Sequence, residues 1–233
     1  MSTGLFSDYN LIDLTHTLNS SAPTWSGNCG FNHKVIVDYP EACRVQSIDM
    51  NAGTGTHIDA PSHFIPGAKS AADIPLDDLI VPVYVIDVSA RAHADYYITP
   101  DDIYAFEKQH GKISAKSLVV GYTGWDQYWH DAKKFRNPDD TGQMHFPGFS
   151  KNSAELLLER GIAGLGIDSL SPDCLDLNFP VHYAILGAGK YIVENLAHCK
   201  LLPPVGAYTI ILPIKTQDGT EAVARAIGLT PKL

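Results

Sequence analysis

The chain has 233 residues, of which 45% are hydrophobic and 18% charged, a composition typical of a globular protein with a full core. Its 17 basic and 26 acidic residues give a net charge of −9, which argues against nucleic acid as a partner. No apolar run reaches 18 residues, so we expect no membrane-spanning helix and no membrane partner. No repeat or linker divides the sequence, and we predict a single domain over residues 1–233.

The start of the chain and its cysteines indicate a cytoplasmic protein. The first ten residues, MSTGLFSDYN, lack the basic and apolar stretches of a signal peptide. The four cysteines are far apart and form no CxxC pair: Cys29, Cys43, Cys174 and Cys199. We interpret them as buried thiols of a protein in a reducing compartment.

In chain order, alternating apolar and polar residues first predict a strand over 11–18, and after a loop rich in Pro and Gly a second over 45–50. The run VPVYVIDVS predicts a buried strand over 81–89. A helix is then expected between Thr99, as its N-cap, and Gly111.

The second half of the chain mixes strands and helices. We predict an amphipathic helix over 150–160 and a helical stretch at 182–186 (HYAIL). Strands are expected at 117–122, 164–168, 190–196, 207–214 and 222–228. Because strands outnumber helices, the expected class is α/β with substantial antiparallel content.

The segment GTHIDAPSHF (55–64) carries the clearest chemical signal. His57, Asp59 and His63 stand at i, i+2 and i+6. In an extended chain, residues two apart share a face, and imidazole beside carboxylate suits a divalent first-row metal. Surface histidines in a turn are the alternative. Three ionisable residues embedded among Gly, Pro and small residues favour a site.

A second group lies downstream. His182 follows a Phe-Pro-Val run, and Glu194 stands inside the apolar strand YIVENL. A buried carboxylate needs a partner, a metal or a raised pKa. Taken alone, this pattern favours a structural ion pair.

Five separated stretches, read together, identify a family resemblance: IDLTHTL, GTHIDAPSHF, FPGFS, GLGIDSLSPD and FPVHYAILGAGKYIVENL. The chain resembles the cyclase family of metal-dependent hydrolases, which includes bacterial kynurenine formamidase and isatin hydrolase. The resemblance implies a mixed, largely antiparallel, barrel-like β-sheet with flanking helices, of the swivelling β/β/α type. It also implies assembly as a homodimer or homotetramer.

The resemblance also implies a set of site residues. His57 and Asp59 are the implied ligands of a first metal, and Asp59 is able to bridge two metals. His182 and Glu194 complete the second metal position. His63 is the implied catalytic acid/base.

Two aromatic residues are implied to line the substrate pocket. Trp25 stands in the loop after the first strand, and Phe64 follows His63. An aromatic wall suits a small planar amide or lactam. Ordinary packing is the alternative for Trp25.

One position departs from the family pattern. The pattern HxGTHxDxPxH begins with a histidine where this chain has Gly53. Asn51, Thr54 or water is then the expected substitute, although amide and hydroxyl oxygens bind zinc less well than imidazole. We therefore expect one Zn²⁺ or Mn²⁺ per chain, or two with unequal affinity.

The predicted function is metal-dependent hydrolysis of a C–N amide or lactam bond. A divalent metal acidifies water and polarises a carbonyl, and His63 exchanges a proton with the leaving nitrogen. The alternative is a non-hydrolytic cyclase or dehydratase, or a catalytically silent binding protein, because Gly53 replaces a ligand.

Two further features have structural interpretations. His16 is expected to satisfy a buried hydrogen bond rather than to bind metal. The aromatic segment 122–130 is interpreted as a loop that covers the site or lies at a subunit interface.

Overall fold

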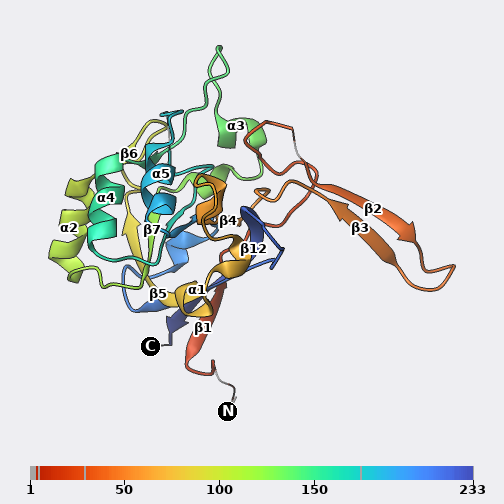
Figure 1. Ribbon diagram of the computed structural model, residues 1–233, viewed down its shortest axis with the longest axis horizontal. Coiled ribbons are helices and arrows are strands. Elements are labelled where there is room, and N and C mark those ends of the chain that lie inside the picture. The colour runs from red at the N-terminus through yellow and green to blue at the C-terminus, as the bar shows by residue number, and fades with distance from the viewer. Residues whose placement is uncertain (1–3, 5, 29, 174, 233) are drawn as a thin grey trace.

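The computed structural model describes residues 4, 6–28, 30–173 and 175–232. Its centre is a sheet with the strand order β1-β12-β11-β5-β7-β9-β10-β4, and a further pairing of β4 with β12 closes seven of these strands into a barrel (Figure 1). The strands are β1 (Tyr9–Asp13), β4 (His57–Asp59), β5 (Ile80–Asp87), β7 (Leu118–Tyr122), β9 (Gly164–Ile167), β10 (Tyr191–Glu194), β11 (Ala207–Pro213) and β12 (Glu221–Pro231). Two smaller pairs are β2 (Asn32–Val37) with β3 (Val45–Asp49), and β6 (Tyr97–Ile98) with β8 (Gly148–Phe149).

The barrel mixes strand directions. The neighbours β5, β7, β9 and β10 run parallel, and the other neighbouring pairs of this sheet are antiparallel. The expected mixed, largely antiparallel, barrel-like sheet with flanking helices is confirmed.

Helices cover the outer face of the barrel. The α-helices are α1 (Leu76–Leu79), α2 (Pro100–His110), α3 (Ala132–Arg136), α4 (Lys151–Glu159) and α5 (Pro180–Gly187), and the 3-10 turns are η1 (Pro61–His63), η2 (Ala71–Asp73), η3 (Trp125–Tyr128) and η4 (Cys199–Leu201). Successive strand residues point to opposite sides, so Val120 belongs to the core inside the barrel. Its neighbour Val119 points outward and belongs to a second core, between the barrel and the helices, together with Ile103 of α2, Leu157 of α4 and Ile185 of α5.

Local capping residues set the ends of two helices, and those of α2 were predicted. Thr99 and Asp102 form a reciprocal capping box at the start of α2, and Gly111 ends the helix at a φ of 90°. The hydroxyl of Ser150 accepts a hydrogen bond from Ser153 N–H at the start of α4. Such helix ends can be predicted from the sequence because a cap is formed by residues close together in the chain.

The first strand lies earlier than predicted. β1 occupies Tyr9–Asp13 rather than 11–18, because its regular pairing with β12 ends at Asp13. Leu14 N–H donates to the Ala226 carbonyl, while the Leu14 carbonyl accepts from Ala197 N–H after β10. The chain therefore turns from β12 towards the segment that follows β10, and the regular ladder of β1 ends there.

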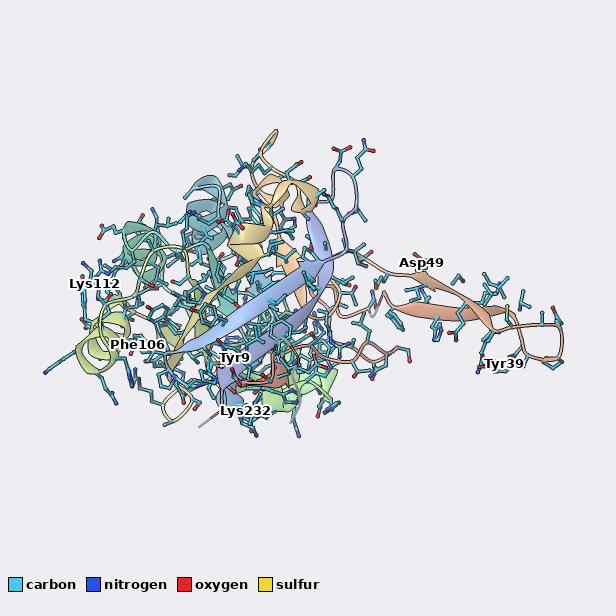
Figure 2. All side chains as sticks on the ribbon, turned by 90° about the horizontal axis from the view of Figure 1, so that it is seen from below. Tyr9, Tyr39, Asp49, Phe106, Lys112 and Lys232 are labelled. Atoms are coloured by element: carbon cyan, nitrogen blue, oxygen red, sulfur yellow. The ribbon has the colours of Figure 1, made fainter. Side chains whose placement is uncertain are left out.

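The hairpin of β2 and β3 projects far from the barrel, and Tyr39 lies near its tip (Figures 1 and 2). The sequence did not predict β2. All five residues of β3 and the first five of β2 are exposed, so neither strand has a buried face to impose a clear alternation.

The interpretation of the cysteines as buried thiols needs correction. Cys43 is exposed and only Cys199 of the described cysteines is buried, while Cys29 and Cys174 lie outside the described residues.

Among the described residues, no helix combines the length and apolar character needed to cross a membrane.

The segment 122–130 does not form an open aromatic surface. Trp125 and Trp129 are 8% and 2% exposed and pack with Phe135 and Phe146 inside the chain. The two indoles therefore belong to the core, and the interpretation of this segment as a subunit interface stays a prediction that does not involve them.

Candidate metal centre and active site

The site is built on the central strand β4. His57 and Asp59 share one face of β4, which pairs antiparallel with β10 on one side and β12 on the other. Glu194 of β10 is directly opposite His57, and Glu221 of β12 is directly opposite Asp59. Because directly opposed residues point to the same face, the register gathers one imidazole and three carboxylates.

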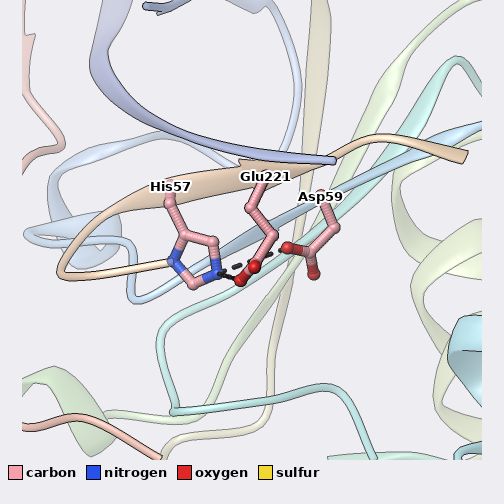
Figure 3. Close-up of side chains that lie close together, drawn as sticks. All are labelled: His57, Asp59 and Glu221. Carbon is pink, nitrogen blue, oxygen red and sulfur yellow. Dashed lines mark ion pairs between the residues drawn. The ribbon is translucent and has the colours of Figure 1, made fainter. Parts of the chain in front are cut away.

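The first group of possible ligands is His57, Asp59 and Glu221 (Figure 3). His57 Nε2 lies 3.3 Å from Asp59 Oδ1 and 3.9 Å from Glu221 Oε1. The other ring nitrogen, Nδ1, lies 2.8 Å from the Gly55 carbonyl oxygen. This contact orients the ring, so that Nε2 faces the carboxylates.

The second group is Asp59, His182 and Glu194. His182 Nε2 lies 3.4 Å from Asp59 Oδ2 and 3.4 Å from Glu194 Oε1. Asp173 lies 2.6 Å from His182 Nδ1 and accepts hydrogen bonds from the N–H groups of Val181 and His182. The first turn of α5 and the His182 ring are thus held by one carboxylate.

These spacings fit a divalent ion. Nitrogen and oxygen ligands at 2.0–2.2 Å from a tetrahedral ion lie roughly 3.3–3.6 Å apart. The contacts of His57 and His182 with Asp59 and Glu194 are 3.3–3.5 Å. Asp59 is 1% exposed, and its Oδ1 has no hydrogen-bond partner among the described residues. A buried carboxylate oxygen without a donor is well suited to a cation.

The charges in this cluster depend on one another. Burial opposes the charged form of His57, but Asp59 and Glu194 outweigh it and raise the pKa of the imidazole to about 10. Burial and the neighbouring Asp59 raise the pKa of Glu194 to about 7. The pKa of Asp59 falls despite burial, because His57 and His182 surround it. Without a metal, protons on the histidines balance the carboxylates.

His63 lies at the end of η1, beside the cluster. Its side chain is 29% exposed, and Nδ1 is 3.8 Å from Glu221 Oε2. Its ring centroid is 6.3 Å from that of His182. His63 is therefore more accessible to a small molecule than the buried His57 and His182.

Aromatic rings form one wall of the cavity, whose volume is about 260 Å³. Phe64 stacks on His182 with centroids 4.6 Å apart, and Trp25 lies 5.8 Å from Phe179. Trp25 is 41% exposed, so it lines the cavity instead of filling the core. The cavity is lined by Trp25, Gly53, His57, Asp59, His63, Phe64, Leu170, Ser171, Phe179, His182, Glu194, Asn195 and Glu221.

The structure brings the predicted residues together and adds three that sequence reasoning missed: Asp173, Phe179 and Glu221. Glu221 stands just before the predicted strand 222–228. An acidic residue at the start of a strand was the only local signal for a role in the site. Asn51, an expected substitute ligand, is exposed.

His16 differs from its interpretation. Its Nε2 is buried without a hydrogen-bond partner in the described chain, and the ring stacks on Trp129 at 4.1 Å. Burial, together with His198 and His130, lowers the pKa of His16 to about 3. The ring is held by stacking in its neutral form.

Comparisons with known proteins identify the family of this chain. The family model Cyclase, described as "Putative cyclase", matches residues 12–174. Isatin hydrolase of Roseibium aggregatum is 37% identical over 191 residues, covering 77% of this chain and 72% of the relative. Kynurenine formamidase of Salinibacter ruber is 28% identical over 224 residues, covering 93% and 96%. A crystal structure of an isatin hydrolase bound to the product analogue thioisatinate has a TM-score of 0.89 at 30% identity, covering 97% of this chain and 94% of that one.

Proposed function

Because the chain belongs to the cyclase family, as its sequence motifs indicated, we propose that it hydrolyses a C–N amide or lactam bond of a small aromatic substrate. Its relatives are named isatin hydrolase and kynurenine formamidase, and the predicted class, a metal-dependent amide hydrolase, is confirmed. The observation that carries the proposal is the convergence of Asp59, His182 and Glu194 beside His63 in one aromatic-walled cavity.

The proposed metal ligands are His57, Asp59, His182 and Glu194. A bound Zn²⁺ or Mn²⁺ supplies acidified water and polarises the carbonyl oxygen of the substrate. One or two ions per chain are proposed. The imidazole and carboxylate donors suit both metals, and the described cluster contains no thiolate that would favour zinc.

The chain's own residues bind the substrate and move the proton. Trp25, Phe64 and Phe179 offer ring faces to a planar substrate. Water adds its oxygen to the carbonyl carbon, the C–N bond breaks, and a proton passes to the leaving nitrogen. We assign that transfer to His63, whose partly exposed ring stands at the cavity.

The alternative of a non-hydrolytic or silent member has no specific observation in its favour. It depended on Gly53, but the described site keeps its second ligand group complete with His63 beside it. The hydrolase proposal uses both features.

Exchange of His63 for alanine tests the mechanism. With N-formyl anilides, isatins and lactones as the substrate panel, we expect kcat to fall by about 10²–10⁴-fold. Metal content should stay unchanged, because neighbouring residues hold the ion. His33→Ala on the exposed hairpin is the control. Full activity in His63→Ala would contradict the assignment.

The single domain and the cytoplasmic location stay predictions, and assembly as a homodimer or homotetramer is a proposal. Exposed apolar side chains on the projecting hairpin support self-association, namely Val35, Ile36, Tyr39, Val45 and Ile48. The mass in solution of the full chain, measured by light scattering, tests the assembly.

A further inference from the structure

The space next to Gly53 is already occupied. A Cβ atom at this position would overlap Glu221 Oε1 and would lie 3.3 Å from His57 Nε2. The φ of Gly53 is not in the left-handed region, so its backbone does not require glycine. Gly53 therefore matters because it leaves room for the carboxylate of Glu221.

Within the described part of the chain, Glu221 pairs with histidines alone. Among the described residues its ion pairs are with His57 and His63, at 3.9 and 3.8 Å, and none is with Lys or Arg. The strand register brings it beside Asp59, while Glu194 approaches from the other side. Converging carboxylates repel one another unless protons or a cation compensate them.

From these observations we propose that Glu221 replaces the histidine absent at position 53, so that His57, Asp59 and Glu221 hold a divalent ion of their own. The inference rests on the proposed metal-dependent function and extends it to a second ion that shares Asp59. Two carboxylates with one imidazole form a harder ligand set than two imidazoles with one carboxylate. This first position therefore favours Mn²⁺ relative to Zn²⁺.

Metal titration of the chelator-treated full chain tests the proposal. Binding of Mn²⁺ is measured by calorimetry and by the electron paramagnetic resonance signal of free Mn²⁺. The wild type should show two classes of binding site that differ in affinity. Glu221→Gln should weaken one class at least about 100-fold, because loss of even an outer-shell partner costs 10–100-fold. His182→Ala should remove the other class. Glu159→Gln, at a side chain 73% exposed, is the matched control.

A reciprocal exchange adds a stricter test. Gly53→His combined with Glu221→Ala restores the imidazole of the family pattern and removes the carboxylate that blocks its space. We expect this double variant to regain the lost class, with the Zn²⁺-to-Mn²⁺ affinity ratio raised about tenfold. Gly53→Ala alone should weaken that class, since its Cβ displaces Glu221.

The outcomes separate this inference from the proposed function. The role of Glu221 would be overturned if Glu221→Gln kept both classes of metal site with unchanged affinity. It would also be overturned if the double variant Gly53→His with Glu221→Ala kept only one class. Either result would hold even if the wild type hydrolyses its substrates. A wild type with two classes, of which Glu221→Gln loses one, supports that role even if no amide is hydrolysed. Far-ultraviolet circular dichroism of each variant verifies that it is folded.

Discussion

The two halves of the ligand cluster differ in burial and support. His182 and Glu194 are 5% and 9% exposed at their side chains, and Asp173 holds His182. On the other side of Asp59, Glu221 and the nearby His63 are 27% and 29% exposed. Both halves line the cavity, but the half with His182 and Glu194 is a buried, preorganised ligand set, whereas the half with Glu221 and His63 is more open. We therefore expect the tighter ion in the buried half and the proton transfer in the open half.

The largest effect should come from the residue that both halves share. Asp59→Asn keeps the size of the side chain but removes the charge, and we expect metal content to fall below about one tenth of the wild type. Because a metal supplies several kcal/mol of transition-state stabilisation, kcat/KM should fall at least about 10³-fold. Asp49→Asn, exposed on β3, is the control. Full metal content in Asp59→Asn would show that the halves do not depend on this bridge.

Metal removal should lower stability mainly through the buried half. An ion at 100 times its Kd adds about 2.7 kcal/mol to the free energy of unfolding, which corresponds to roughly 5–10 °C in Tm for a chain of this size. Calorimetric Tm values with metal and with chelator measure this difference. Glu221→Gln should keep most of the metal-dependent increase in Tm, and His182→Ala should lose that increase. A larger loss in Glu221→Gln than in His182→Ala would show that the open half binds the more stabilising ion.

Asp173→Asn tests whether the buried half depends on its support. Asp173 acts as a positioning residue through His182, so we expect metal affinity in that half to fall about 10–100-fold while the open half keeps its affinity. The matched control is Asp176→Asn, in the exposed loop nearby. Equal weakening of both classes would mean that the substitution disturbs the whole fold, which the Tm would reveal.

The smallest effect should leave both halves intact. Trp25→Ala removes one aromatic wall, and we expect KM to rise about tenfold, equivalent to roughly 1.4 kcal/mol, with little change in kcat. Metal content should not change. Tyr104→Ala, at an exposed ring on α2, is the control. An unchanged KM would favour the packing interpretation of Trp25.

Much of the fold was predictable because its signals are local. The helix between Thr99 and Gly111 follows from a capping box and a C-terminal glycine. The buried strands β5 and β7 follow from continuous apolar runs. β2 escaped prediction because no face of it is buried, and β1 was displaced because Leu14 bridges two distant elements.

The sequence by itself determined the pair His57 and Asp59 on one face, since spacing by two in a strand needs no distant contact. It also placed His63 within reach and marked Glu194 as a buried acid in an apolar strand. Only the tertiary structure decided that Glu221 joins them, because its position depends on the closure of the barrel between β4 and β12. Register between strands far apart in the chain is set by whole-barrel packing, which no local pattern encodes.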